Sequence, residues 1–145
     1  MQDLNGQEMK LENQLCFPLY ACSREVIKRY RPFLDAVGLT YTQYVTMLVL
    51  WEESAVSVKE LGQRLYLDSG TLTPVLKSLE QKGYITRRRS ESDERVLIAA
   101  LTDDGAALRE TAAAIPQQIC ACLRLEPEEA VQLHRLLYKL LHAIG

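Results

Sequence analysis

Residues 59–95 constrain the fold of this chain more than any other stretch, because two short helical patterns are followed there by a basic hairpin pattern. Apolar residues recur at positions 58, 61 and 65, and again at 72, 75, 76 and 79, each time with the spacing of one helix face. A break at Leu67-Asp68-Ser69-Gly70 separates the two patterns, and Gly83 stands where a helix C-cap is expected. Two helices joined by a tight turn form the unit that presents its second helix to DNA.

The outward side of the second helical pattern carries short hydroxyl side chains and one cation, which can reach base edges and phosphates. These side chains are Ser69, Thr71, Thr73 and Lys77. After Gly83 a strand-like segment becomes Arg87-Arg88-Arg89, a polar tip spans residues 90–94, and an apolar segment returns through residues 95–101. This order predicts a β-hairpin with a basic arm, which is a wing.

Charge supports a DNA-contacting role for this region. Residues 59–89 contain seven basic and three acidic side chains, a local balance of +4 in a chain whose net charge is −2. A basic segment on an acidic chain indicates contact with phosphates at one defined surface. The alternative is a solvated helix and hairpin whose arginines serve only solubility. The joint occurrence of helix-turn-helix, small polar face and basic hairpin favours the DNA-binding interpretation.

Length and composition place the chain in an ordinary class. Its 145 residues, 48% of them hydrophobic, suffice for one globular domain with a core. Charges interrupt every apolar segment, and the polar residues 1–10 lack the apolar core of a signal peptide, so we expect a cytoplasmic location. Four cysteines in such a chain are expected to be free thiols, redox-active groups or ligands rather than a static disulfide framework.

The first half of the chain is expected to be helical on both sides of Gly38. Residues 1–11 resemble a frayed end, and a long helix is predicted from Glu12, with an apolar stripe at positions 15, 19, 22, 26 and 30. Pro18 requires that this helix either begin close to Phe17 or kink there. Thr40 is a good N-cap for a second helix to about Trp51, with positions 41, 44, 45, 48 and 51 on its buried side and a polar connection at residues 52–57.

The second half ends in two further helices. Thr102 caps a long helix that Pro116 is expected to bend, and a final helix opens at residues 126–129. That final helix is apolar over more than half of its circumference, so we expect a dimer built from the first helix and the last two. The predicted fold is mainly α with a small β wing. A single domain, residues 1–145, is expected to comprise a winged helix-turn-helix lobe at 57–101 and dimerisation helices at 12–37 and 103–143.

Four segments carry a resemblance to a known family. They are Leu11-Glu12-Asn13-Gln14-Leu15-Cys16-Phe17, the segment LTYTQY at 39–44, the segment LYLDSGTLTP at 65–74 and the segment SDER at 92–95. With the order of elements, they resemble the MarR family of bacterial regulators, and within it the OhrR branch of organic-hydroperoxide-sensing repressors. The resemblance spans about residues 11–143. It implies a homodimeric transcriptional repressor of the oxidative-stress response that binds double-stranded operator DNA, is induced by organic hydroperoxide and needs no cofactor or metal.

The resemblance places the redox-sensing thiol at Cys16 and its hydrogen-bonding phenols at Tyr30 and Tyr41, with Tyr20 nearby. The chemistry is consistent with this, because a thiolate attacks the peroxide O–O bond and the positive potential of a helix start favours a thiolate. Apolar neighbours of Cys16 suit an alkyl or lipid hydroperoxide better than hydrogen peroxide. From the residues alone, Cys16 could instead be a small core residue, which is the common role of a free cysteine.

The OhrR branch contains one-cysteine members and two-cysteine members, and the latter form an intersubunit disulfide. The position of the second cysteine falls on Ala121, between Cys120 and Cys122, which lie about 200° apart on a helix. We expect the two-cysteine mechanism, with Cys120 or Cys122 as the partner of Cys16. Cys22 lies on the apolar stripe of the first helix and is expected to have a core role.

The resemblance also implies the DNA contacts. The major-groove side chains would be Asp68, Ser69, Thr71, Thr73, Pro74 and Lys77. In the wing, Arg88 and Arg89 would approach the minor groove or its phosphates. Asp93 would pair with Arg95 and hold it toward the DNA backbone.

Three other functions use the same residues. A MarR-type repressor could bind a small aromatic ligand between its DNA lobe and dimer core, with the tyrosines and Trp51 as pocket walls. A zinc-responsive regulator would use Cys120, Cys122, His134 and His142, which form a weak metal pattern. A thiol peroxidase would turn over at Cys16, but the chain has no peroxidase signature, so we expect no enzymatic activity.

Overall fold

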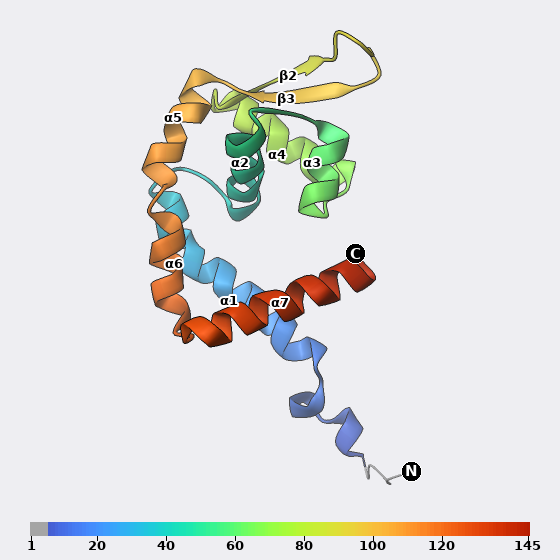
Figure 1. Ribbon diagram of the computed structural model, residues 1–145, viewed down its shortest axis with the longest axis vertical. Helices are drawn as coiled ribbons and strands as arrows, with labels where there is room; N and C mark the ends of the chain where they lie inside the picture. Colours follow the sequence, from blue (N-terminus) through green and yellow to red (C-terminus); the bar gives the residue numbers. More distant parts are fainter. Residues whose placement is uncertain (1–5) are drawn as a thin grey trace.

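The computed structural model describes residues 6–145, which form helices α1 to α7, two single 3-10 turns and a small antiparallel sheet (Figure 1). The 3-10 turns are Gln7–Met9 and Leu11–Asn13, and the helices are α1 (Cys16–Asp35), α2 (Tyr41–Glu53), α3 (Val58–Leu65), α4 (Ser69–Gln81), α5 (Asp103–Ala112), α6 (Ile115–Leu123) and α7 (Pro127–Ile144). The strands are β1 (Ala55–Ser57), β2 (Ile85–Arg89) and β3 (Leu97–Leu101). This confirms the predicted mainly helical fold with a small β wing.

The start of α1 decides between the two predicted alternatives, in favour of a helix that begins close to Phe17 and against a kinked helix from Glu12. The helix begins at Cys16 and not at Glu12, and the expected frayed end contains the two 3-10 turns, while residues 1–5 lie outside the described part. The physical reason is Pro18, which has no backbone N–H and whose ring would clash with the carbonyl of Gln14 inside a longer helix. Starting the helix at Cys16 puts Pro18 in the first turn, where proline is tolerated.

Helix α2 begins as predicted at the Thr40 N-cap. The Thr40 hydroxyl accepts a hydrogen bond from the Gln43 backbone N–H, and the Gln43 side chain accepts one from the Thr40 N–H, which makes a complete capping box. The same Gln43 side chain donates to the Ser78 hydroxyl over 2.8 Å and accepts from the Lys82 ammonium over 3.0 Å. The start of α2 is therefore bonded directly to the C-terminal half of α4.

Four buried or partly buried apolar positions of α4, at 72, 75, 76 and 79, confirm the predicted inward face of the second helical pattern. The predicted break is shorter than expected, because Asp68 is the N-cap and Ser69 and Gly70 already belong to α4. Helix α3 ends at Tyr66, which adopts a left-handed conformation with φ of 55°. Gly83, with φ of 82°, follows the end of α4 as expected for a C-cap glycine.

The sheet contains one strand more than the sequence analysis expected. Residues 52–57 are not only a polar connection, because β1 pairs antiparallel with β3 and places Val56 opposite Ala99. On its other edge β3 pairs antiparallel with β2, with Arg88 opposite Ile98. A three-residue strand before a helix leaves too few residues for an alternating pattern, so this strand had no sequence signal.

The hydrophobic core lies between α2, α3, α4 and the sheet, and the ends of α1 and α5 close it. Its most deeply buried side chains are Met47, Leu50, Leu61, Leu72, Leu76, Leu79, Ile85 and Ile115. Of the five α2 positions expected to be buried, Leu48 is a wrong prediction, because 42% of it is exposed. Gln43 and Thr46 are buried instead, since the capping box and a hydrogen bond from Thr46 to the Thr42 carbonyl satisfy their polar groups.

The predicted third long helix is divided into α5 and α6 at residues 113–114, two residues before Pro116, so the expected bend is confirmed. Helix α6 lies against α1, whereas α7 extends across the molecule with every residue exposed except the partly buried Leu141 (Figure 1). Among the described residues 6–145, no helix combines the length and the apolarity needed to cross a membrane.

Gly105, in the first turn of α5, allows a close approach that any side chain would prevent. A Cβ atom at this position would lie 2.0 Å from the Tyr84 carbonyl oxygen, and the Trp51 indole N–H donates to the Gly105 carbonyl over 2.8 Å. We predict that Gly105→Ala lowers the free energy of unfolding by about 3 kcal/mol, the upper range for overpacking.

Urea denaturation of the two proteins measures this difference. Gly70→Ala is the matched control, because its Cβ would meet only the Asp68 carboxylate at 3.3 Å and alanine favours helix. An equal stability loss in both variants would show that the close approach at Gly105 has no special role.

Candidate DNA-reading surface and thiol site

The N-terminus of α4 is fixed by its own first residues. The Asp68 carboxylate accepts a hydrogen bond of 2.7 Å from the Thr71 backbone N–H, and this bond holds the pKa of the Asp68 carboxyl below its usual value. The carboxylate therefore stabilises the first turn of the helix. Contact between Asp68 and the major groove remains a prediction. Capping of α4 is a second role for Asp68, and it does not depend on DNA.

The other side chains predicted to read DNA lie on the outer surface of α4. Ser69, Thr71, Pro74 and Lys77 are exposed. Thr73 is partly buried, and its hydroxyl donates to the Ser69 carbonyl over 2.7 Å. The six predicted groove residues thus extend from the N-cap of α4 to Lys77, five of them are exposed, and the Thr73 hydroxyl is already bonded within the helix.

The wing is attached to α4 by an ion pair that the sequence analysis did not predict. The Arg87 guanidinium donates two hydrogen bonds, of 3.1 and 3.3 Å, to the Glu80 carboxylate. This contact lowers the pKa of the Glu80 carboxyl. Of the three consecutive arginines, Arg88 and Arg89 are exposed, whereas Arg87 is held against the recognition helix.

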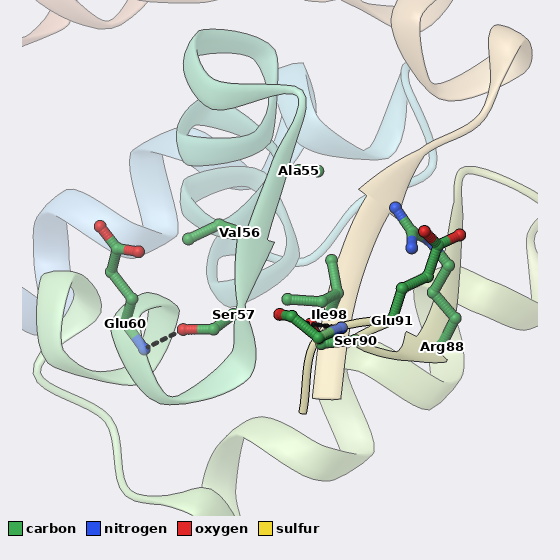
Figure 2. Close-up of a pocket in the computed structure, with 9 residues that line it drawn as sticks. Ala55, Val56, Ser57, Glu60, Arg88, Ser90, Glu91 and Ile98 are labelled. Carbon is green, nitrogen blue, oxygen red and sulfur yellow. Dashed lines mark hydrogen bonds between the residues drawn. The ribbon is translucent and has the colours of Figure 1, made fainter. Parts of the chain in front are cut away.

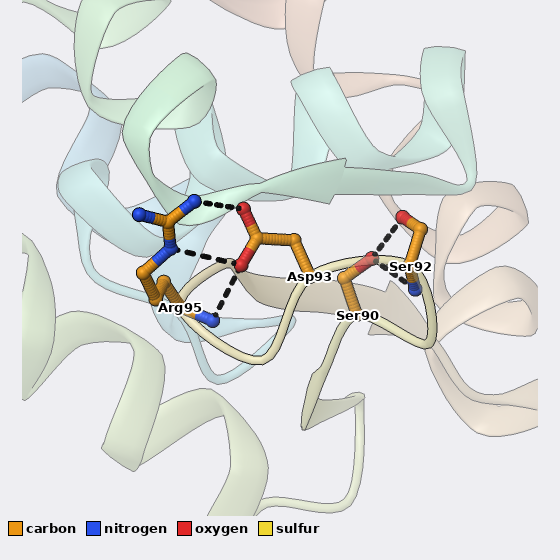
Figure 3. A network of polar contacts seen from close by, with 4 residues as sticks. All are labelled: Ser90, Ser92, Asp93 and Arg95. Carbon is orange, nitrogen blue, oxygen red and sulfur yellow. Dashed lines mark hydrogen bonds and ion pairs between the residues drawn. The ribbon is translucent and has the colours of Figure 1, made fainter.

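The tip of the wing contains the predicted pair of Asp93 and Arg95 (Figure 3). The Arg95 side chain donates to both carboxylate oxygens, over 3.1 and 3.2 Å, and its backbone N–H donates to one of them over 3.0 Å. The side-chain bonds from Arg95 lower the pKa of the Asp93 carboxyl. The pairing is confirmed, while the approach of Arg95 to the DNA backbone stays a prediction.

A shallow hollow of about 580 Å³ lies between β1 and the wing (Figure 2). Its polar lining comes from Ser57, Glu60, Arg88, Ser90, Glu91 and Ser92. The Ser57 hydroxyl is engaged, because it accepts the Glu60 backbone N–H over 3.1 Å and so caps α3. Arg88 therefore shares this hollow with residues 90–92 at the wing tip.

Cys16 is the first residue of α1 and is exposed. Leu15, which precedes it, is 84% exposed, and Phe17, Leu19 and Tyr20 are also exposed. The Arg24 guanidinium lies over the Tyr20 ring, with 5.5 Å between the Arg24 Cζ atom and the ring centroid. The predicted sensing thiol therefore stands at a helix N-terminus among exposed apolar side chains.

The phenols predicted to serve this thiol form a separate cluster. The Tyr30 ring lies 5.0 Å from the Tyr41 ring and 5.9 Å from the Tyr44 ring, measured between ring centroids. Cys16 and Tyr30 are fourteen residues apart on one helix, which separates them by about 21 Å at 1.5 Å per residue. The structure brings Tyr30 and Tyr41 together, but it does not bring them to Cys16 of the same chain.

Burial raises the pKa of Tyr30 to about 12, and the neighbouring Tyr41, Tyr44 and Cys120 add to this shift. The Tyr30 phenol is therefore protonated at neutral pH and can donate a hydrogen bond. Burial, followed by the neighbouring Tyr138, raises the pKa of Tyr41 in the same way. The sequence did not indicate that Tyr44 and Tyr138 are neighbours of Tyr30 and Tyr41. Tyr44 belongs to an ordinary apolar stripe, and Tyr138 is distant in the sequence.

The remaining cysteines are all exposed free thiols in α1 and α6. Cys120 is the one that influences Tyr30, and Cys122 lies about 200° farther around α6. The core role expected of Cys22 is wrong within one chain, because the first half of the α1 stripe has no covering element there. Among residues 6–145, no three His, Cys, Asp or Glu side chains are grouped to hold a metal ion, so the proposed zinc set does not assemble.

Comparison with known proteins agrees with this geometry. A family profile described as transcriptional regulator SarA/Rot matches residues 28–111. The organic hydroperoxide resistance transcriptional regulator of Bacillus subtilis (strain 168) is 54% identical over 136 residues, which covers 94% of this chain and 92% of that protein. The chain is a transcriptional regulator of the winged-helix MarR/SarA-Rot type.

Two solved structures are similar to this MarR/SarA-Rot regulator over nearly its whole length. Reduced AbfR bound to DNA, from a protein of Staphylococcus epidermidis, is 40% identical, with a TM-score of 0.77 over 97% of this chain and 99% of AbfR. Disulfide-formed AbfR is 39% identical, with a TM-score of 0.66 over 97% and 99%. Members of this family are DNA-binding regulators and not enzymes.

The exposed wing arginines generate a prediction for this MarR/SarA-Rot regulator. We expect Arg88→Ala or Arg89→Ala to weaken binding to every duplex tested and to lower the salt dependence of log K by about one ion per lost phosphate contact. Fluorescence anisotropy at several salt concentrations measures both quantities.

Thr73→Ala and Lys77→Ala provide the comparison, because substitutions on α4 should change the preference among operator variants more than the salt dependence. The assignment of the wing to phosphate contact fails if Arg88→Ala and Arg89→Ala leave the salt dependence unchanged.

Proposed function

We propose that this protein is a dimeric, cytoplasmic repressor that releases its operator when an organic hydroperoxide oxidises Cys16. The observation that carries the proposal is the similarity to an organic hydroperoxide regulator over nearly the full chain, together with an exposed cysteine at the first position of α1. The neighbouring AbfR structures support a redox switch, because that protein was solved in reduced, DNA-bound and disulfide forms.

The proposed oxidation balances with the hydroperoxide as the sole oxidant. The Cys16 thiolate attacks one peroxide oxygen, the O–O bond breaks, and the departing alkoxide takes up a proton and leaves as the alcohol. The sulfur loses two electrons and becomes a sulfenic acid. The exposed Leu15, Phe17 and Leu19 offer apolar contact to the alkyl part of the peroxide, so the preferred substrate class is an alkyl or lipid hydroperoxide.

The thiol site requires a second copy of the chain. Within one chain about 21 Å of helix separates Cys16 from Tyr30, so the Tyr30 and Tyr41 phenols can reach the thiol only from another subunit, whereas Tyr20 follows Cys16 by four residues in the same helix. Helix α7 supports this dimer, because its apolar side chains have no cover in one chain. They are Val131, Leu133, Leu136, Leu137, Leu140 and Ile144, all more than a third exposed. In the dimer, residues 12–37 and 103–143 form the contact between subunits, and residues 57–101 remain free for DNA.

In this dimer Cys120 is the better candidate for the second thiol. It lies near Tyr30 of its own chain, so a Cys16 that reaches Tyr30 of the second copy also approaches Cys120 of that copy. The Cys120 thiol then attacks the Cys16 sulfenic sulfur, a disulfide forms, and water leaves. Disulfide formation needs Cα atoms within about 7 Å, so the first helix must move toward α6 of the second copy.

Movement of the helices explains the release of DNA. A dimer that reads a pseudo-palindrome must hold its recognition helices about 34 Å apart. The described chain is more similar to reduced, DNA-bound AbfR than to disulfide-formed AbfR, as the two TM-scores show. This difference supports a disulfide form of changed shape, in which the half-site spacing is lost and the dimer dissociates from the operator.

A repressor controlled by a small aromatic ligand is the second candidate. The observation that favours it is the aromatic cluster, in which Tyr44 lies 6.4 Å from both Tyr41 and Trp51. Such a repressor would release DNA on adding the ligand, with all four cysteines replaced by serine. Under the redox proposal, the same variant without cysteines should keep its DNA when peroxide is added. One binding assay with ligand and with peroxide therefore separates the two functions.

Replacement of the sensing thiol tests the proposal directly. We predict that Cys16→Ser binds operator DNA like wild type but no longer releases it after cumene hydroperoxide, because a hydroxyl cannot become a sulfenic acid. Gel-shift titrations of DNA upstream of the protein's own gene measure this before and after the peroxide, and again after dithiothreitol. Release of DNA by Cys16→Ser at the wild-type peroxide dose would exclude Cys16 as the sensor.

The phenols give an independent measure of the same site. We expect Tyr30→Phe and Tyr41→Phe to retain DNA binding and to slow the peroxide-driven release, since each loses one hydrogen-bond donor. Tyr84→Phe is the matched control, because Tyr84 lies in the DNA-binding lobe and its variant should react at the wild-type rate.

The two cysteines of α6 should behave differently. We predict that peroxide converts wild type and Cys122→Ser to a covalent dimer on non-reducing gels, whereas Cys120→Ser forms none. Sedimentation of the reduced proteins should give a non-covalent dimer in all three. A covalent dimer that persists in Cys120→Ser would identify Cys122 or Cys22 as the partner, and a wild-type protein without a covalent dimer would be a one-cysteine sensor.

A further inference from the structure

The end of α7 touches the turn between the two helices of the DNA-reading motif. A Cβ atom built at Gly145 would lie 2.7 Å from the Cε1 atom of the Tyr66 ring and 3.0 Å from its Cδ1 atom. Gly145 also lines a largely apolar groove together with residues of α3, the turn and α4. The groove residues include Val58, Gly62, Tyr66, Leu67 and Leu72.

Tyr66 is an unusual residue for its backbone conformation. It ends α3 with φ of 55° and ψ of 37°, where glycine is preferred and other residues carry strain of about 1 kcal/mol or more. Two residues later Asp68 caps α4, so the conformation of Tyr66 sets the direction in which the recognition helix begins. A large aromatic ring that is 49% exposed brings no core burial that offsets this strain. Its contact with Gly145 gives the ring a function.

One face of α7 is turned toward α2 and toward the turn after α3 of its own chain. Tyr138 adds to the upward pKa shift of Tyr41 in α2, Leu141 is the partly buried residue of the helix, and Gly145 meets Tyr66. These positions are spaced i, i+3 and i+7, which is one helix face. In Figure 1 the C-terminal end of α7 lies on the side of the molecule where α3 lies. The opposite, apolar face of α7 remains for the second copy.

We propose that α7 is a strut whose C-terminal end docks on Tyr66 and positions the start of the recognition helix relative to the dimer core. Gly145 of this same chain thus forms one wall of the α3–α4 groove, beside Tyr66. A displacement of α7 in the dimer core is passed to the Tyr66 turn and from there to Ser69 and Thr71. Tyr66 is a positioning residue, and the inference needs only DNA binding, not the redox step of the proposed function.

A double-mutant cycle on the reduced protein tests the strut. One variant is Tyr66→Gly, which removes the ring and suits the left-handed conformation, so the turn itself should fold at least as well. The other is deletion of residues 143–145. We expect each change to weaken operator binding by about 5- to 10-fold, a typical coupling between two sites, and the combination to weaken it no further than either alone. Anisotropy titrations without peroxide give the affinities, and sedimentation verifies the dimer.

Gln81→Ala, at the exposed far end of α4, is the control and should leave the affinity unchanged. Three results would each overturn the strut. The losses of affinity from the two changes could multiply in the combined variant, Tyr66→Gly could weaken binding while the deletion does not, or both variants could bind with wild-type affinity. None of these outcomes bears on whether Cys16 senses peroxide.

Discussion

The rigidity of α1 is the constraint on which the rest of this molecule depends. A continuous 20-residue helix fixes Cys16 and Tyr30 at opposite ends of a span of about 21 Å. No local flexibility can bring the two together, because Pro18 lies in the first turn and the helix is continuous beyond it. If Cys16 is the sensing thiol, as proposed above, the phenols of Tyr30 and Tyr41 can serve it only from a second copy of the chain.

The sequence predicted the DNA-reading lobe almost completely, because its signals are local. The capping residues Thr40 and Thr102, both predicted from the sequence, define helix starts by hydrogen bonds within three residues. The pair of Asp93 and Arg95 is two residues apart and was equally accessible from the sequence. For the start of α1 the sequence left two alternatives, a helix from close to Phe17 or a kinked helix from Glu12, since an apolar stripe does not reveal where the first backbone hydrogen bond forms; the structure shows the first.

The thiol site could not be predicted to the same extent, because its geometry depends on contacts across the chain. The resemblance named Cys16, Tyr30 and Tyr41, but only the structure separates the first from the other two. The same holds for β1, which exists only through its pairing with β3, and for the Gln43 bond to Ser78, which joins residues 35 apart. The preference for Cys120 over Cys122 likewise depends on which side of α6 meets Tyr30.

The pair of Arg87 and Glu80 has a consequence for how the protein responds to a changing signal. It fastens the wing to the recognition helix, and β2 also packs against α4, so the two DNA-contacting elements form one body. A tilt of this body would move the wing and α4 together and leave no state in which the wing alone stays attached. Each repressor molecule should then be either fully bound or fully released, and a partly attached species should not accumulate as oxidation proceeds.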